Sequence, residues 1–543
     1  MTDNMNKQPK KRGKKKIALM RISFYALLIA TAVTLAFLAY IGLNKVLTGK
    51  FLVIIAAVLI GLLCAGFVSV ILWGKRSKTH PKRSKIVNNI AIMMSVLLSM
   101  ILGFASFYIM KMDQSVASLQ NTTYNTSVKL YCLNEVLVDK DPGLDIKRSI
   151  DKEYDNIMTL VGTVENMDSV TIAYRDNIDT ENNNNTIEKI NEILGENGIT
   201  PVYETYIDFD SMVNDLYDGK VDFILFNDAF VDVIMDHFDD FETKCSYAYY
   251  ANFSSDILFT ANVDDITKEA FVVYISGHDT RGNRFSDTAR TDVNILAVVN
   301  PVDKKVLLIS TPRDYYVPLW GQQSKMDKLT HAGVYGVECA IETLNALYDV
   351  EIDYYVKVNF NSVVDIIDAL GGIKVDSEYE FSSKYSLSGK RYYFEEGTNT
   401  LSGDAALAFC RERYSLPGGD RARGINQQAV IKGVINKVIS PDVVTKLTDI
   451  LDAISDNVRT NIDTSSLYAL ANMQLIDMSP WDITTISATG SDAHRTTYSG
   501  GSMELYVMLQ NETLINKIKG MANEVIEMDA EELDNLHSAI EGN

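Results

Sequence analysis

The chain has 543 residues, enough for more than one domain, and a formal net charge of −20 at pH 7. Residues 1–112 hold 17 Lys/Arg and one acidic residue, whereas residues 113–543 hold 34 Lys/Arg and 70 acidic residues. The acidic body excludes nucleic acid as a general partner, because neutralising phosphates requires a basic surface. A basic, apolar head before such a body indicates a membrane anchor with a soluble part outside the membrane.

The head contains three apolar runs of at least 20 residues: Ile22–Leu43, Phe51–Trp73 and Ile90–Ile109. Each is long enough to cross a hydrocarbon core of about 30 Å. Cations are dense in 10–16 and 75–85, which places the basic tail 1–21 in the cytoplasm and the chain beyond about 113 outside the cell. We therefore expect three transmembrane helices within 22–112. The first run is too long for a cleaved signal peptide.

Residues 113–264 predict a small extracellular accessory α/β domain. Apolar strands are expected at 169–175, 200–206 and 221–227, and they alternate with helices at 186–198 and 211–220. The polar run ENNNN at 181–185 is expected to be a loop tip. No motif here carries chemistry, so a spacer or interaction module is favoured over a ligand sensor.

The next domain, expected at 265–530, places charged residues at the ends of apolar strands. Strand 270–277 runs toward Asp279, strand 293–301 begins directly after Asp292, and strand 304–311 ends just before Arg313. Strand ends are where α/β folds usually place their sites. Helices are expected from Lys328 to Ala346, at 361–372 and at 422–439, and an acidic tail at 531–543.

A second charged cluster, CRERYSLPGGDRARGINQQ, contains Arg411, Arg413, Asp420, Arg423 and Gln427, followed by Gln428. Arg423 and Gln427 are four apart on the predicted helix and share a face. Carboxylates are the ligands that Mg²⁺ prefers, and guanidinium groups match phosphate oxygens bidentately. Such parts suit phosphoryl transfer, which depends mostly on positioning and charge neutralisation. Taken singly, pairs such as Arg290–Asp292 are also typical of surface ion pairs.

Five cysteines do not make a disulfide framework, and their spacings do not match a zinc site. Cys410 adjoins Arg411, but no histidine is near it in sequence, which favours a packing or disulfide cysteine over a nucleophile. His278 is expected to be a loop residue and His331 a structural one.

The two clusters, joined by KLTHAGVYGVECAIETLNAL, VKVNFNSVVDIIDALGGIKVD and LSGDAALAFCRERY, resemble the LytR-CpsA-Psr family of Gram-positive cell-wall ligases. The resemblance covers roughly 271–438. The three-span head and the extra domain before the core are similar to the capsule-type branch. Two positions depart from the family pattern, which often has Thr where this chain has Val293 and Tyr315.

The resemblance implies an α/β/α core with an apolar tunnel for a lipid tail. It implies transfer of a glycopolymer, such as capsular polysaccharide or teichoic acid, from a polyprenyl-pyrophosphate carrier to peptidoglycan. It also implies roles for the charged residues: Mg²⁺ (or Mn²⁺) on Asp279 and Asp292; pyrophosphate on Arg290, Arg313, Lys328, Arg411, Arg413, Arg423 and Gln427; catalysis by Asp292, Arg313, Arg411 and Asp420.

Two other functions remain open from the sequence. A hydrolase that cleaves the lipid pyrophosphate without ligating the polymer would use the same residues. A non-catalytic regulator of envelope synthesis is less compatible with the short cytoplasmic tail, which has no helix-turn-helix.

Overall fold

The computed structural model describes residues 9–43, 46, 49–76, 79–120, 123–135, 153–165, 167–257, 259, 261–278, 288–384, 386–417, 419–440, 450, 458–502 and 504–527. The chain forms two compact units. The anchor unit comprises residues 1–118 and 462–478, and the body unit comprises residues 119–461 and 479–543.

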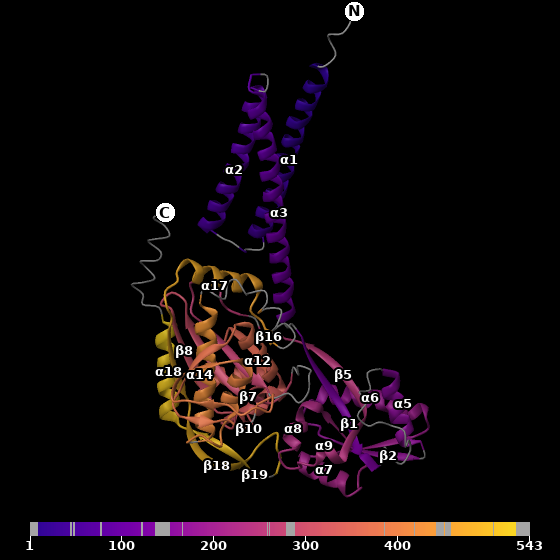
Figure 1. Ribbon diagram of the computed structural model, residues 1–543. Coiled ribbons are helices and arrows are strands. Elements are labelled where there is room, and N and C mark those ends of the chain that lie inside the picture. Colours follow the sequence, from indigo (N-terminus) through magenta and orange to yellow (C-terminus); the bar gives the residue numbers. More distant parts are fainter. Residues whose placement is uncertain are drawn as a thin grey trace, which may run out of the picture. The chain divides into compact units, whose positions relative to one another are not determined.

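The anchor unit contains three long helices, α1 (Pro9–Leu43), α2 (Gly49–Lys75) and α3 (Pro81–Leu119) (Figure 1). All three are long and apolar enough to cross a membrane, which confirms the three expected spans. α3 continues past the expected start of the accessory domain at 113. A short helix, α17 (Thr464–Ile476), completes the unit, although its sequence lies within the stretch expected to form the core.

The accessory domain is built on a five-stranded sheet of order β3-β2-β4-β1-β5. β2 is parallel to β3 and β4, whereas β1 is antiparallel to β4 and β5. Its strands are β1 (Thr123–Leu133), β2 (Ser169–Tyr174), β3 (Thr200–Thr205), β4 (Phe223–Asn227) and β5 (Cys245–Asp256). Its helices are α5 (Glu153–Val164), α6 (Thr180–Glu196), α7 (Phe209–Tyr217), α8 (Val231–Ile234) and α9 (Phe241–Lys244), with a 3₁₀ turn at Asp228–Phe230. The three predicted strands are confirmed.

The expected loop at 181–185 is wrong, because these residues form the first turns of α6. Asn183 is buried, and its amide donates to the carbonyls of Arg175 (3.1 Å) and Ile178 (2.9 Å). A run of asparagines is therefore helical here because one of them satisfies buried backbone carbonyls. The expected helix at 186–198 is confirmed as the greater part of α6, in which Ile190 and Leu194 are fully buried.

The core domain is built on a six-stranded sheet of order β16-β11-β6-β7-β8-β17. β6, β7 and β8 form an antiparallel meander, β11 is parallel to β6, and β17 is parallel to β8. The strands are β6 (Phe271–His278), β7 (Thr291–Asn300), β8 (Lys305–Thr311), β11 (Tyr354–Asn359), β16 (Val458–Thr460) and β17 (Asp482–Ser487).

Helices cover both faces of this sheet, which confirms the α/β/α layers. α11 (Val337–Tyr348) and α18 (Glu512–Ile526) pack on one face, and α12 (Phe360–Ala369) and α14 (Asp420–Val438) on the other. The remaining elements are β9 (Tyr316–Pro318), β10 (Met326–Lys328), α10 (Leu329–Ala332), β12 (Ile373–Ser377), β13 (Phe381–Ser382), β14 (Tyr393–Phe394), β15 (Gly397–Leu401), α13 (Gly403–Arg411), β18 (Gly490–Thr496) and β19 (Glu504–Gln510), with a 3₁₀ turn at Gly333–Tyr335.

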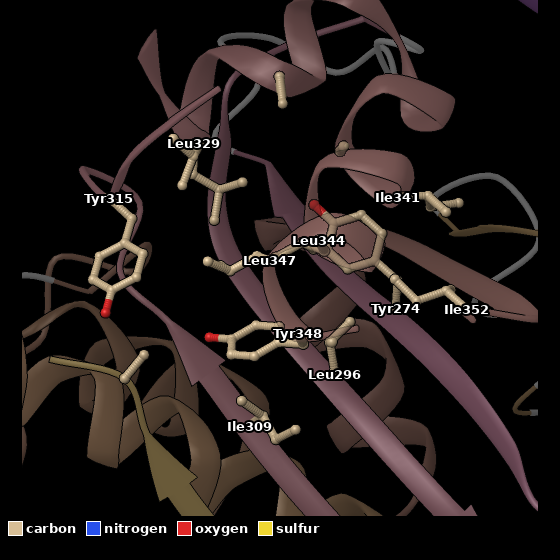
Figure 2. Packing of buried hydrophobic residues seen from close by; sticks show 14 of the residues in the cluster. Tyr274, Leu296, Ile309, Tyr315, Leu329, Ile341, Leu344, Leu347, Tyr348 and Ile352 are labelled. Atoms are coloured by element: carbon tan, nitrogen blue, oxygen red, sulfur yellow. The ribbon is translucent and has the colours of Figure 1, made fainter. Parts of the chain in front are cut away.

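Buried tyrosines fill the core between α11 and the sheet, among the aliphatic side chains that Figure 2 shows. Two of the buried hydroxyls pair with side chains of neighbouring strands. Tyr274 donates to Asn294 Oδ1 at 2.7 Å, and the Tyr348 hydroxyl lies 2.7 Å from Thr311 Oγ1. Because buried polar groups are costly when unpaired, the first bond stabilises the pairing of β6 with β7, and the second holds α11 against the end of β8.

The single helix expected from Lys328 to Ala346 is also a wrong prediction, since Lys328 ends β10 and the helix is broken into α10, a 3₁₀ turn and α11. The break is at two glycines. A Cβ on Gly333 would lie 2.5 Å from the Ala289 carbonyl oxygen, and Gly336 has φ 107°. The first glycine allows the chain to pass close to the residues that precede β7, and the second allows the turn.

Candidate active site

An aspartate and an arginine face each other across neighbouring strands. β7 and β8 pair with Asn294 opposite Thr311, and continuing this antiparallel register by two residues brings Asp292 opposite Arg313. Arg313 Nη1 donates to Asp292 Oδ1 at 2.7 Å. The side chains are 28% and 21% exposed, so this charge-assisted pair remains open to a ligand from solvent.

The backbone around Arg313 is held in place by the first turn after β8. The Tyr315 N–H donates to the Pro312 carbonyl (3.1 Å), and the Thr330 N–H donates to the Arg313 carbonyl (2.8 Å). Tyr315 is itself fully buried, and its hydroxyl donates to the Thr489 carbonyl at 3.0 Å. The departure from the family pattern at this position therefore serves packing.

Asp314 links Arg313 to Lys328. Its Oδ2 lies 3.5 Å from Arg313 Nε, and its Oδ1 lies 3.2 Å from Lys328 Nζ. The Lys328 side chain is only 9% exposed. Negative and positive charges alternate from Asp292 through Arg313 and Asp314 to Lys328. These ion pairs fix the positions of all four side chains near the ends of β7 and β8. Asp314 was not among the predicted site residues, although it directly follows Pro312 and Arg313 in the sequence.

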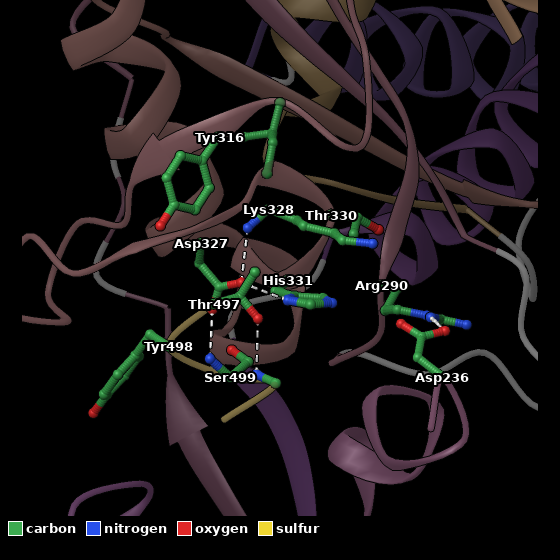
Figure 3. A network of polar contacts seen from close by, with 12 residues as sticks. Asp236, Arg290, Tyr316, Asp327, Lys328, Thr330, His331, Thr497, Tyr498 and Ser499 are labelled. Atoms are coloured by element: carbon green, nitrogen blue, oxygen red, sulfur yellow. Dashed lines mark hydrogen bonds and ion pairs between the residues drawn. The ribbon is translucent and has the colours of Figure 1, made fainter. Parts of the chain in front are cut away.

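The buried Asp327 accepts a hydrogen bond from the backbone of Lys328 and holds this segment in place (Figure 3). Asp327 Oδ1 accepts the Lys328 N–H (2.7 Å) and lies 2.6 Å from His331 Nδ1, while Oδ2 accepts the Ser499 N–H (2.7 Å). Burial would raise the pKa of Asp327, but the charge and hydrogen bond of His331, with Ser499, outweigh it and lower that pKa. Asp327 therefore stays ionised, and His331 has the structural role expected from the sequence.

Arg290 is held by the accessory domain. Its Nη1 donates to Asp236 Oδ1 at 2.8 Å, and its Nε lies 3.9 Å from Asp232 Oδ2. Figure 3 shows Arg290 and Asp236 side by side. Arg290 thus pairs with a different domain, and not with Asp292 as the alternative of a surface ion pair would have it. Sequence patterns gave no signal for this contact, because the partners are far apart in the chain.

Two contacts between α14 and β8 show in which direction the helix runs along the strand. A Cβ on Gly424 would lie 3.7 Å from Ser310 Oγ, and Gln428 Nε2 donates to the Leu308 carbonyl at 3.3 Å. The N-terminal end of α14 is therefore directed toward the end of β8 that leads to Arg313. Helix N-termini are favourable places for phosphate groups.

The residues of α14 divide into a packed side and a partly open side. Ala422, Asn426 and Gln428 are buried, and Gln428 also bonds the Ile486 carbonyl (2.7 Å). Gln428 therefore anchors the helix to the sheet. Arg423 and Gln427 are partly exposed, one helical turn apart on a common face, as the sequence predicted.

Arg411 and Arg413 are exposed on either side of a buried carboxylate. Glu412 accepts the backbone N–H groups of Lys384 (2.6 Å) and of Tyr414 (2.9 Å). Burial opposes ionisation, but the backbone N–H groups outweigh it and lower the pKa of Glu412. This glutamate, which the sequence analysis did not single out, fixes the turn that presents both arginines to solvent.

Two predicted residues are not placed. Asp279 lies outside the described residues, and Asp420 begins α14 with its side chain outside them. The described part of the chain contains no group of three or more His, Cys, Asp or Glu residues that could hold a metal. The pairing of Asp279 with Asp292 as metal ligands therefore remains a prediction.

The expectation that His278 is a loop residue is wrong. His278 ends β6 and is buried, so it is a strand residue and not a loop residue. Burial, with the charge of Lys357, lowers the pKa of His278 well below 6.5, and Ser276 Oγ lies 2.9 Å from its Nε2. A neutral, enclosed imidazole here is part of the packing.

All five cysteines are free. Cys410 packs against the apolar cluster formed by α12, α13 and α14, and burial raises its pKa to about 12. A thiol with that pKa is protonated at neutral pH and is a poor nucleophile. The expectation of a packing cysteine is confirmed.

The chain is similar to proteins named as teichoic acid transferases. It is 36% identical over 205 residues to the polyisoprenyl-teichoic acid–peptidoglycan teichoic acid transferase TagU of Enterococcus faecalis, which is 38% of this chain and 65% of that protein. It is 37% identical over 202 residues to TagU of Bacillus subtilis, 37% of this chain and 63% of that protein. The chain thus spans a little under two thirds of the length of these relatives.

The crystal structure of B. subtilis TagV matches with a TM-score of 0.41 and 28% identity, covering 48% of this chain and 99% of that one. The profile of the LytR_cpsA_psr family matches residues 243–517, about half of the chain. This stretch contains the Asp292–Arg313 pair, both arginine clusters and α14. The chain belongs to the LytR_cpsA_psr family.

Proposed function

We propose that the chain is a membrane-anchored phosphotransferase that moves a glycopolymer from a polyprenyl-pyrophosphate carrier to peptidoglycan. Family membership and the transferase names of the relatives support this function. The observation that carries it is the partly exposed Asp292–Arg313 pair at the ends of β7 and β8, with the N-terminal end of α14 directed toward it.

The arginines and Lys328 would bind the pyrophosphate. Lys328 and Arg313 share Asp314, so their positions are fixed before substrate arrives. Arg423 and Gln427 lie on the same partly open side of α14. Preorganised cations stabilise charge that develops in a transition state without reorganising at the moment of reaction. Arg313 and Arg423 are therefore the groups to which we assign the transition-state contacts.

We further propose that Asp292, with Asp279, would hold Mg²⁺ or Mn²⁺. Asp292 fits this role, because Arg313 bonds one of its carboxylate oxygens while the side chain stays partly open to solvent. Mg²⁺ is usually held by one or two carboxylates plus substrate phosphate oxygens. When bound, the ion would neutralise charge on the phosphate oxygens.

The transfer is a phosphoryl substitution. A peptidoglycan sugar hydroxyl attacks the phosphorus that carries the glycan, a new P–O bond forms, and the bond to the second phosphate breaks. Polyprenyl phosphate leaves with the electron pair, and the hydroxyl proton passes to a base or to water. Arg313 and the other cations would stabilise the leaving phosphate and the five-coordinate phosphorus.

The same proposal places the body unit outside the cell. The basic residues at 10–16, in the first turns of α1, and at 75–85, around the α2–α3 linker, favour a cytoplasmic location for the N-terminus. The carrier lipid and the peptidoglycan acceptor would then be on the same side of the membrane as Asp292.

The function is tested with the full-length chain in nanodiscs, a synthetic polyprenyl-pyrophosphoryl sugar and a peptidoglycan oligomer. We expect a peptidoglycan-linked sugar phosphate and polyprenyl phosphate, formed only when the acceptor is present. Equal release of polyprenyl phosphate with and without acceptor would instead establish a hydrolase. No turnover of the donor under either condition would reject catalysis in favour of the regulator.

A further inference from the structure

One helix of the anchor unit carries no charge, although the rest of the chain beyond the spans is strongly acidic. α17 has the sequence TSSLYALANMQLI, bounded by Asp463 at its N-cap and by Asp477. It belongs to the same compact unit as the three spans. The chain enters it from β16 and leaves it toward β17, the two edge strands of the core sheet.

Two hydrogen bonds attach α17 to the ends of the spans, and a third joins two of those ends to each other. Asp113, near the C-terminal end of α3, accepts from Tyr468 of α17 (2.9 Å) and from Tyr40 of α1 (2.6 Å). Asn472 Nδ2 of α17 donates to the carbonyl of Val46 at 2.7 Å. The attachment is therefore made by a shared carboxylate and by a backbone carbonyl.

These partners define the depth of α17 relative to a bilayer. Val46 lies in the short linker between α1 and α2, and Tyr40 is three residues before the end of α1. A linker that joins two adjacent spans must lie at a membrane surface, because each span uses its length to cross about 30 Å of hydrocarbon. Tyrosines are also typical of this interfacial layer. α17 is thus held at the level of the lipid headgroups.

The C-terminal end of α17 presents apolar side chains that the protein leaves uncovered. Leu475, Ile476 and Met478 are 40%, 58% and 57% exposed. Single exposed apolar residues are ordinary on protein surfaces, but three within four positions beside the ends of membrane spans form a patch. Tyr468, on the same helix, is buried toward the anchor.

We propose that α17 is an interfacial helix that rests in the bilayer surface next to the α1–α2 linker, with Leu475, Ile476 and Met478 inserted among the lipids. The helix has no basic residue and is flanked by aspartates, so its binding is apolar and does not require anionic lipids. This contact is independent of the proposed catalysis. It adds a fourth point at which the chain meets the membrane.

The test uses the full-length chain in nanodiscs, in a Cys64→Ala, Cys410→Ala background that leaves only buried thiols. A polarity-sensitive fluorophore is attached at Ile476→Cys or, as the matched control, at Ile207→Cys, which is an 86% exposed isoleucine of the accessory domain. We expect lipids with a nitroxide near the headgroup to quench the probe at 476 several-fold more than the probe at 207. Aqueous iodide should show the opposite order.

Two results would overturn the proposal. Equal iodide quenching at 476 and 207 would mean that α17 lies in water. Protection of the 476 probe from both quenchers would mean that protein, such as a second copy of the chain, covers the patch. A second variant, Leu475→Ser with Met478→Ser, should reduce lipid quenching at 476 in both neutral and anionic nanodiscs, while the melting temperature reports that the fold is intact.

Discussion

Arg290 Nη1 donates to Asp236 Oδ1 at 2.8 Å, so an arginine predicted to bind pyrophosphate is neutralised by a carboxylate of the accessory domain. The pair is partly exposed, at 18% and 28% of the two side chains. A phosphate group that binds Arg290 must compete with Asp236. If Arg290 binds the pyrophosphate as proposed, this contact would give the accessory domain a direct electrostatic influence on substrate binding.

The first prediction follows from that competition. Asp236→Asn keeps an oxygen acceptor for Arg290 but removes the charge, so we expect the KM for the lipid pyrophosphate donor to fall. Partly exposed ion pairs contribute about 0–1 kcal/mol, which limits the change to roughly fivefold or less. Steady-state kinetics measure it, with Asp239→Asn as the control on the same segment. A higher KM or a lower kcat would show instead that Asp236 positions Arg290.

The second prediction concerns Asp292. Asp292→Asn should abolish transfer because the proposed metal ligand loses its charge, and EDTA should have the same effect on the wild type. The free energy of unfolding should change by only about 1 kcal/mol or less, since the pair with Arg313 is partly exposed. Kinetics and thermal unfolding on the same sample separate the two effects. Normal turnover by a stable Asp292→Asn protein would remove this residue from the mechanism.

The third prediction separates a surface arginine from a phosphate clamp. Arg423→Lys keeps the charge but loses the bidentate fork. If Arg423 binds phosphate oxygens in the transition state, the loss should be about 2–4 kcal/mol, or roughly 30- to 1,000-fold in kcat/KM. Arg391→Lys, at an exposed site of the same domain, should be silent. A rate for Arg423→Lys within threefold of wild type would reject the clamp.

The fourth prediction tests topology. An impermeant thiol reagent applied to intact cells should modify Glu192→Cys, which is exposed on α6, and should spare Thr79→Cys between α2 and α3. Both variants are made in a Cys64→Ala, Cys410→Ala background, in which only buried native thiols remain. Asn183, on the same helix, is unsuitable for labelling because it is buried, although the sequence around it is polar. Modification of Thr79→Cys alone would invert the topology and with it the location of the substrate.

The fifth prediction concerns pH. The hydrogen bond that His237 Nδ1 donates to Asp210 Oδ1 raises the pKa of His237 above 6.5, against burial, which lowers it. Because the folded-state pKa is raised, the stability contributed by His237 is complete below pH 6.5 and is lost as the pH rises through the folded-state pKa. The melting temperature of the accessory domain should therefore fall on the alkaline side of 6.5. His237→Gln should flatten that slope, whereas His494→Gln, at an exposed histidine, should retain it.

Sequence reasoning located the strands well because burial on both sheet faces leaves unbroken apolar runs, as in β4, β7 and β8. Placing Asp292 and Arg313 at strand ends followed from the same runs. The common helix face of Arg423 and Gln427 was also predictable, because the four-residue spacing of a helix alone determines this face.

The errors arose where tertiary contacts overrode local pattern. Asn183 became helical because buried carbonyls needed its amide, and Gly333 broke a helix because another segment passes close to it. The partners of Arg290 could not be found from spacing, because carboxylates are abundant in an acidic chain and only folding selects Asp236 among them. Sequence therefore identified the charged residues but not the pairing between domains.

The β7–β8 hairpin has a consequence for how the site assembles. Asp292 and Arg313 are 21 positions apart, whereas Gln428, which docks α14 on β8, is 120 positions from its partner Leu308. A hairpin can form in about 1–10 μs, well before so distant a helix is captured. Asp292 and Arg313 are therefore already paired when the hairpin forms. The hairpin then has no unpaired charge at these two positions during the time before α14 packs on β8.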